Sequence, residues 1–534
     1  MNCTDDLYVG KYGQGTLNIS NGGNVSCGSA HIGDGSGSTG EVSVDGEGSS
    51  WSCSWDLYVG DKGQGTLNIS NGGNVICKRG CIHGSARGMV SVDGEGSNWS
   101  CEEHLSVAGR LEITNGGNVS CGDAGYIGRY SSSMGEVSVD GEGSSLSCSK
   151  NLFVGHFGQG TLDISNGASA ICHDGYIGNR SGSSGEVSVD GEGSSLSCSW
   201  NLYVGKEGQG TLNISNGGNV NVTRETWVAS KEGSTGKINF SNGTLTTGEL
   251  LAAPADLTGT GAINTHGIVS DIGFLFDSTH GTNQTIILDS LPGQNITINL
   301  SQDSTGSLGA GYASEGTLTI KDGVSVQSYR GILGHKSGSA GQATVDGAGS
   351  SWSCSSDLYV GFLGLGTLEI SNGGNVTCEN EYYDVHGYIG YDYGSIGDVS
   401  VDGAGSSCNC GDELYVGYAG QGTLDITNGG NVSCYAGYIG HWSGSTGEVS
   451  VDGAGSSLSC SDDLYVGKYG EGTLNISNGG NVEVGGTLRI NSTGTLNIDS
   501  ASSVNVGGAI LFKQDSTLTA QEGAEVHMTG ANFQ

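Results

Sequence analysis

An internal repeat constrains this chain more than any other feature of its sequence. The segment "LYVGKYGQGTLNISNGGNVSC" begins at Leu7, and close copies begin at Leu57, Leu202, Leu358, Leu414 and Leu464. Each long unit of about 50 residues divides into two similar halves of about 25 residues. Because one such unit cannot bury its own apolar side chains, stacked copies must share a continuous core.

Each half-unit contains three short runs of alternating apolar and polar residues, such as "LYV", "TLNI" and "VSC". This alternation is typical of β-strands, with Leu17 and Ile19 on the buried face. Gly22-Gly23 separates two runs and favours a tight turn. The pattern predicts an all-β fold: a single-stranded, right-handed parallel β-helix with about 25 residues and three strands per coil.

The repeat divides the chain into four predicted segments. Residues 1–222 and 351–484 are regular β-helix repeats, 223–350 form a divergent β-helical segment with longer loops, and 485–534 form coils of short eight-residue strand-turn units. The divergent segment lacks cysteine and contains both prolines, Pro254 and Pro292. An inserted globular binding module is the alternative for this segment, although "GTLTI" near its end returns to the phase of the repeat.

Charge excludes several kinds of partner. The chain has 19 Lys and Arg residues against 55 Asp and Glu residues, a net charge of −36. Such a surface repels phosphate backbones, so we expect no nucleic-acid partner. We predict no transmembrane segment, since no stretch approaches about 20 consecutive apolar residues. Met1-Asn2-Cys3 is already in phase with the repeat, and we expect the chain to be part of a longer protein.

Cysteines recur at the end of the third run and form a predicted ladder. The ladder comprises Cys27, Cys53, Cys77, Cys101, Cys121, Cys148, Cys172, Cys198, Cys354, Cys378, Cys410, Cys434 and Cys460. Each shares the parity of an apolar neighbour two residues earlier, so we expect the thiols to point inward. They form either a buried stack of small side chains or inter-coil disulfides, because stacked α-carbons about 4.8 Å apart are within disulfide range. The sequence contains no CxxC motif, so nothing in the cysteine spacing indicates a metal array.

Aromatic residues recur just before each Val-Gly or Ile-Gly pair. The predicted stripe comprises Tyr8, Tyr58, Tyr126, Phe153, Tyr176, Tyr203, Tyr359, Tyr388, Tyr415, Tyr438 and Tyr465. Leu7 and Val9 flank Tyr8 and point inward, so we expect the rings on the outer face. The stripe either stabilises the sheet by ring stacking or binds sugar rings or a partner protein.

Carboxylates recur in the turn "VDGEG". Four copies carry an Asp-x-Glu pair (Asp45/Glu47, Asp93/Glu95, Asp140/Glu142 and Asp190/Glu192), whereas later copies keep only Asp346, Asp402 and Asp452. Calcium needs about six to eight oxygen ligands, more than one such turn supplies. We therefore expect a turn on a solvated edge, no metal site and no cofactor, with calcium as the open alternative.

Catalytic motifs are missing from the sequence. No nucleophile elbow, HExxH, P-loop or dinucleotide fingerprint occurs, so we do not expect an enzyme. A polysaccharide lyase or glycoside hydrolase is the alternative, because the divergent segment holds non-repeating polar residues. Its candidate catalytic residues are His266, Asp271, Asp277, His280 and Arg330.

The repeat also supports a family resemblance. "LYVGKYGQGTLNISNGGNVSC" followed by "IGDGSGSTGEVSVDGEGSSW" resembles the strand repeats of bacterial autotransporter-type (type V secretion) passenger proteins and of PEP-CTERM-associated surface proteins. The resemblance implies an extracellular or cell-surface, adhesin-like structural protein without catalytic activity. It also implies surface glycans or other cell-surface proteins as partners. A polysaccharide-binding or polysaccharide-degrading β-helix is the alternative.

Overall fold

The computed structural model describes residues 1–84 and 88–529. Throughout these ranges the chain consists of β-strands joined by turns, and the only helical element is the 3₁₀ turn Pro254–Asp256. Within the same ranges no helix is long and apolar enough to cross a membrane. The predicted all-β fold is confirmed.

Three strands make one coil, and each pairs in parallel with its equivalent in the next coil. The first two coils comprise β1 (Leu7–Val9), β2 (Gln14–Ser20), β3 (Asn24–Cys27), β4 (Ala30–Ile32), β5 (Thr39–Asp45) and β6 (Ser50–Cys53). β1 pairs with β4, β2 with β5 and β3 with β6. Leu17 lies opposite Val42, one coil of 25 residues later. The predicted parallel β-helix with three strands per coil is confirmed.

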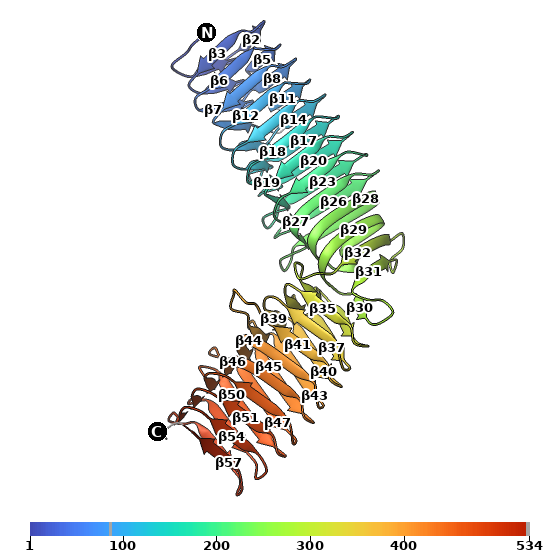
Figure 1. Ribbon diagram of the computed structural model, residues 1–534. Coiled ribbons are helices and arrows are strands. Elements are labelled where there is room, and N and C mark those ends of the chain that lie inside the picture. The colour runs from blue at the N-terminus through green and yellow to red at the C-terminus, as the bar shows by residue number, and fades with distance from the viewer. Residues whose placement is uncertain (85–87, 530–534) are drawn as a thin grey trace. The chain divides into compact units, whose positions relative to one another are not determined.

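The same pairing continues along the chain. Figure 1 shows β2 and β5 beside β8 (Gln64–Ser70), β11 (Gly88–Asp93) and β14 (Arg110–Thr114), each in register with the next. The coils form two compact units. Unit 1 comprises Met1–Gly248, Ala255–Asn264 and Ile286–Ile298, and unit 2 comprises Glu249–Pro254, Thr265–Thr285 and the described chain from Asn299.

Alternation along the long strands builds the core. On β8, Leu67 and Ile69 are fully buried, whereas Asn68 between them faces outward. Burial of such a side chain contributes roughly 1.5–3 kcal/mol, largely offset by the entropy of ordering the chain. Trp51, Trp99 and Trp352 are also fully buried and are the largest side chains of the core.

Glycine at one inward position explains why the sequence repeats every second coil. Gly125 on β16 (Gly125–Ile127) pairs with Leu152 on β19 (Asn151–Val154) of the next coil. A Cβ at Gly125 would lie 2.6 Å from Cys148 Sγ and 3.2 Å from Leu152 Cδ1. The missing side chain therefore makes room for the leucine and cysteine of the following coil, and the two kinds of coil are complementary.

Candidate functional site: the outer corner of the coils

The predicted aromatic stripe lies on the outer side of the short strands and forms continuous ring stacks. We call it the tyrosine column. In unit 1 the ring centroids of Tyr126, Phe153, Tyr176 and Tyr203 are separated by 5.0, 4.8 and 5.0 Å. Tyr8 and Tyr58 stack on either side of His31, at 4.7 and 4.9 Å. In unit 2 the column comprises Tyr359, Tyr388, Tyr415, Tyr438 and Tyr465, with spacings of 4.9–5.1 Å.

Stacking determines what the tyrosine column can offer a ligand. Most of its rings are half-buried, and their faces contact the rings of neighbouring coils. Several hydroxyls also donate to a carboxylate two residues earlier, as from Tyr58 to Asp56 at 2.7 Å and from Tyr359 to Asp357 at 2.8 Å. Burial and the acidic neighbour raise the pKa of both phenols. A ligand therefore meets ring edges here, not ring faces.

A second aromatic column, which the sequence analysis missed, lies beside the first in unit 2. It consists of the residues after the Val-Gly, Ile-Gly or equivalent pair: Tyr312, His335, Phe362, Tyr391, Tyr418 and His441. Successive ring centroids lie 5.0–5.3 Å apart. The two columns meet edge to face, as between Tyr388 and Tyr391 at 5.0 Å and 80°. Burial and Lys468 lower the pKa of His441 to about 4, so its ring is neutral at neutral pH.

Solvent-exposed rings and cations gather at the turn that follows the tyrosine column. We call the two residues after each Val-Gly, Ile-Gly or equivalent pair the corner residues. In successive coils of unit 1 they are Arg129-Tyr130, His156-Phe157, Asn179-Arg180, Lys206-Glu207 and Ser230-Lys231. The exposed fraction is 60% for Tyr130 and 47% for Phe157. In unit 2 the exposed rings Trp442 and Tyr469 flank Lys468, whose Nζ lies 4.3 Å from the Tyr438 ring.

The corner concentrates positive charge on an acidic chain. Nine of the 19 Lys and Arg residues are corner residues: Lys11, Lys62, Arg110, Arg129, Arg180, Lys206, Lys231, Lys336 and Lys468. Only five of the 55 Asp and Glu residues are corner residues: Asp34, Asp61, Glu207, Asp392 and Asp515. This excess of Lys and Arg can be found from the sequence, but only after the coils are aligned on their Val-Gly pairs.

The cysteine ladder lies inside the coils. Thirteen predicted members are buried, and Cys27 pairs in register with Cys53. Close Sγ–Sγ contacts join adjacent rungs in pairs: Cys27–Cys53 (3.5 Å), Cys77–Cys101 (3.6 Å), Cys121–Cys148 (2.8 Å), Cys172–Cys198 (3.4 Å) and Cys434–Cys460 (3.4 Å). All sixteen cysteines are thiols in this structure. Burial and the neighbouring sulfur raise the pKa of Cys101 well above its usual value, which disfavours the reactive thiolate.

The aspartate of each "VDG" turn joins adjacent coils. Ser70 Oγ and Asn71 Nδ2 of the following coil each donate to Asp45 Oδ1 at 2.7 Å. The same pair of bonds recurs at Asp93, Asp140, Asp190, Asp346, Asp402 and Asp452. We call these contacts the aspartate staples. They lower the pKa of Asp45, Asp190, Asp346 and Asp402.

The aspartate staples bear on the calcium alternative. The oxygen that accepts both hydrogen bonds is occupied, and the Glu of each pair, such as Glu47, is solvent-exposed. In residues 1–84 and 88–529 no group of three or more His, Cys, Asp or Glu side chains is placed to hold a metal ion. The absence of a metal or cofactor stays a prediction, with calcium as the open alternative.

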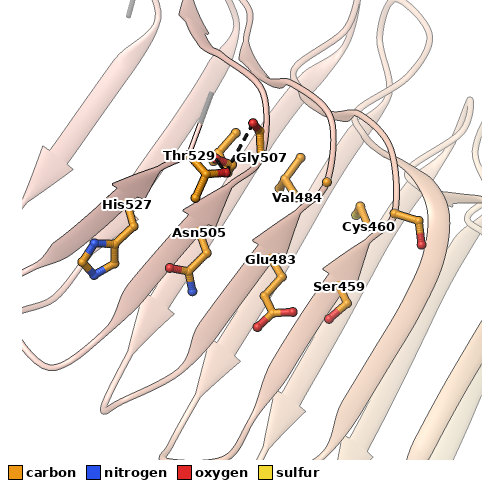
Figure 2. A pocket seen from close by; sticks show the side chains of 11 residues that line it. Ser459, Cys460, Glu483, Val484, Asn505, Gly507, His527 and Thr529 are labelled. Carbon is orange, nitrogen blue, oxygen red and sulfur yellow. Dashed lines mark hydrogen bonds between the residues drawn. The ribbon is translucent and has the colours of Figure 1, made fainter. Parts of the chain in front are cut away.

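A hollow of about 360 Å³ lies over the last coils of unit 2 (Figure 2). Its strands are β48 (Ser457–Cys460), β51 (Asn481–Val484), β54 (Ser503–Val506) and β57 (Glu525–Met528). Figure 2 shows the outward residues Ser459, Glu483, Asn505 and His527 in one row. Asn481 Nδ2 donates to Glu483 Oε1 at 3.1 Å, and His527 Nε2 lies 3.2 Å from Glu525 Oε2. Each titratable group is thus held by a neighbour on its own strand.

The candidate catalytic residues are engaged in separate contacts. Asp277 Oδ1 lies 2.8 Å from His280 Nδ1 and accepts the backbone N–H of His280, which lowers the pKa of Asp277. The backbone N–H groups of residues 313 and 314 donate to Asp271 Oδ1. His266 Nδ1 lies 3.0 Å from Asp303 Oδ2, and the Arg330 guanidinium lies over the Tyr329 ring. Only Asp277 and His280 are brought together, and a carboxyl group with a lowered pKa is a poor general acid at neutral pH.

The chain is an acidic, parallel β-helical repeat protein with stacked aromatic rings on its outer side. No protein-family model matches the chain, and no curated protein matches it. One similar solved structure is the "Crystal structure of TibC-catalyzed hyper-glycosylated TibA55-350 fragment". It is 12% identical, the match covers 98% of this chain and 100% of that chain, and the TM-score is 0.19. A likeness at this TM-score carries no argument about function.

Proposed function

We propose that this chain is a non-catalytic structural protein that acts outside the cell or at its surface and mediates adhesion. One observation carries the proposal: the side chains capable of chemistry recur from coil to coil. The aspartate staples, the cysteine ladder and the tyrosine column are copied along both units, and the members of each set contact residues of the next coil. An active site is a single constellation with matched pKa values, whereas regular copies stabilise a scaffold.

Two further features support the adhesive part of the proposal. The repeat resembles those of autotransporter-type passenger proteins and PEP-CTERM-associated surface proteins, which implies display outside the cell. The corner residues repeat exposed rings and cations at coil spacing, and repeated weak contacts add up to strong attachment when several engage together.

Attachment of cells tests the proposal. Cells that produce the protein are compared with cells in which its gene is deleted, on glycan-coated and protein-coated surfaces. We expect deletion to reduce attachment severalfold and gene restoration to recover it. Equal attachment by both strains would contradict the adhesive role.

A cleavage assay separates adhesion from the enzymatic alternative. Purified protein is incubated with neutral and acidic polysaccharides, and new reducing ends are measured. We expect no increase over buffer. An increase that Asp277→Asn or His280→Gln abolishes would replace the adhesive proposal with a polysaccharide-degrading one.

A further inference from the structure

The corner residues of five successive coils in unit 1 form a continuous strip. The short strands before them are β16, β19, β22 (Asp174–Ile177), β25 (Leu202–Val204) and the end of β27 (Asn219–Val228). These strands pair in register, each with the next. Equivalent corner residues therefore recur about every 4.8 Å, the spacing of hydrogen-bonded strands. We call this surface, from Arg129 to Lys231, the corner strip.

Two rings of the corner strip are exposed to solvent, and each has an arginine over one face: the Arg129 guanidinium lies 5.5 Å from the Tyr130 centroid and that of Arg180 lies 6.0 Å from the Phe157 centroid. Tyr130 and Phe157 lie in adjacent coils and are both exposed. Phe157 meets His156 edge to face at 4.5 Å and 83°. Within the described part of the chain neither ring stacks in parallel on another, unlike the rings of the tyrosine column. Exposed aromatic rings of this kind suit contact with the apolar faces of sugar rings.

Two cations of the corner strip, Arg129 and Lys206, have no carboxylate partner among the described residues. Arg129 lies over the Tyr126 ring at 4.5 Å, and Lys206 lies 4.8 Å from the Tyr176 ring. Among the described residues neither has a carboxylate within ion-pair distance, although the chain carries a net charge of −36. Burial lowers the pKa of Lys206, so an approaching anion would offset its lost hydration. Arg180, a third cation of the strip, does have a carboxylate partner and pairs with Glu207 at 3.4 Å.

We propose, as a refinement of the adhesive function, that the corner strip binds an acidic polysaccharide. Tyr130 and Phe157 stack on its sugar rings, while Arg129 and Arg180 bind its carboxylates. Arginine suits this role because its planar guanidinium pairs with a carboxylate through two parallel hydrogen bonds.

Charge density favours a polysaccharide over a nucleic acid. Duplex DNA carries a negative charge about every 1.7 Å, and a chain with a net charge of −36 repels such a dense polyanion. A uronic acid polymer has at most one carboxylate per sugar, with uncharged ring faces between them. The corner strip likewise combines uncharged rings with separated cations: its first two coils hold the exposed rings, and its first, third, fourth and fifth coils hold the cations.

Binding of polygalacturonate by the full chain tests the proposal. Methyl-esterified polygalacturonate, which keeps the sugar and loses the charge, serves as the neutral probe, and single-stranded DNA as the phosphate probe. We expect polygalacturonate, alginate or hyaluronan to bind more tightly than either probe, with affinity falling as salt rises. We expect Arg129→Gln combined with Arg180→Gln to weaken binding about tenfold or more, as two lost charged contacts predict.

A second pair of substitutions separates stacking from charge. Tyr130→Ala combined with Phe157→Ala removes the rings and keeps the cations, so we expect weaker binding with an unchanged salt dependence. Lys150→Gln and Tyr383→Ala are the matched controls: both side chains are exposed outside the corner strip, and Lys150 is paired with Asp123. Circular dichroism verifies that every variant is folded.

Three outcomes would overturn the proposal: no binding to any of the three acidic polymers, binding that the four corner substitutions leave unchanged, or equally tight binding of DNA. In each case the attachment assay separates this inference from the proposed function. Attachment that still depends on the gene would leave the adhesive role standing and exclude only the polysaccharide ligand.

Discussion

Replacement of Gly175 by alanine tests how the two kinds of coil fit together. Gly175 on β22 lies opposite Leu202 of the next coil. A methyl group there would lie 2.8 Å from Leu202 Cδ1 and 3.0 Å from Cys198 Sγ. Both distances are shorter than the optimal carbon contact of about 3.5–4.0 Å. The φ angle of Gly175 is outside the left-handed region, so the expected cost is steric.

We expect Gly175→Ala to lower the free energy of unfolding by about 1–3 kcal/mol, the usual cost of an added methyl group in a filled core. Alanine also restricts the unfolded chain, which favours folding by up to about 1 kcal/mol. Gly13→Ala is the matched control, since a Cβ at Gly13 meets no atom within 4 Å. Leu202→Val removes the Cδ1 atom, so it should recover part of the loss in the Gly175→Ala background.

Urea unfolding followed by circular dichroism measures the global change. Hydrogen exchange at β22 and β25 measures the local one, because long repeat arrays can unfold in parts. Equal stability of Gly175→Ala and Gly13→Ala, or no recovery by Leu202→Val, would refute the complementary packing of the two coils.

Three further predictions follow from the ladders. The staples lower the pKa of Asp402, so their stabilisation is present above the ordinary pKa of 3.8 and is lost as pH falls through the folded-state pKa. The urea concentration at the unfolding midpoint should therefore decrease when the pH is lowered from about 5 to about 2, and the decrease should be smaller in Asp402→Asn. Cys3 is one of two cysteines that are not buried, and burial raises the pKa of the other, Cys81, to about 12; mass spectrometry should find Cys3 alkylated first, and rapid alkylation of buried rungs in native protein would contradict the packing. Tyr415→Ala removes stacking on Tyr388 and Tyr438 and should lower the free energy of unfolding in urea by about 2–4 kcal/mol. A loss below about 0.5 kcal/mol, which is typical of surface substitutions, would contradict a stabilising column.

The architecture was predictable because one pattern recurs many times. Alternation at Leu17 and Ile19, followed by Gly22-Gly23, determines strand, turn and inward face in every copy. The reason for the two-coil period was not predictable, since it depends on Leu152 filling the space above Gly125 in another coil. Packing between coils is a property of the stacked structure, not of one repeat.

The surface was predicted only in part. The tyrosine column was found because its residue type recurs, but its stacking depends on ring orientation, which sequence does not determine. The second column was missed because the same position holds Arg129 or Lys206 in unit 1 and Tyr391 or Tyr418 in unit 2. The aspartate staples were read as turns, since their serine and asparagine partners lie about 25 residues later in the chain.

Labelling of intact cells tests the central claim most directly. An antibody against the folded chain is applied to intact and to permeabilised cells that produce the protein. If the protein lies at the cell surface, intact and permeabilised cells should be labelled equally, and the label should be lost when intact cells are treated with an external protease. Label that appears only after permeabilisation would contradict an adhesive role outside the cell.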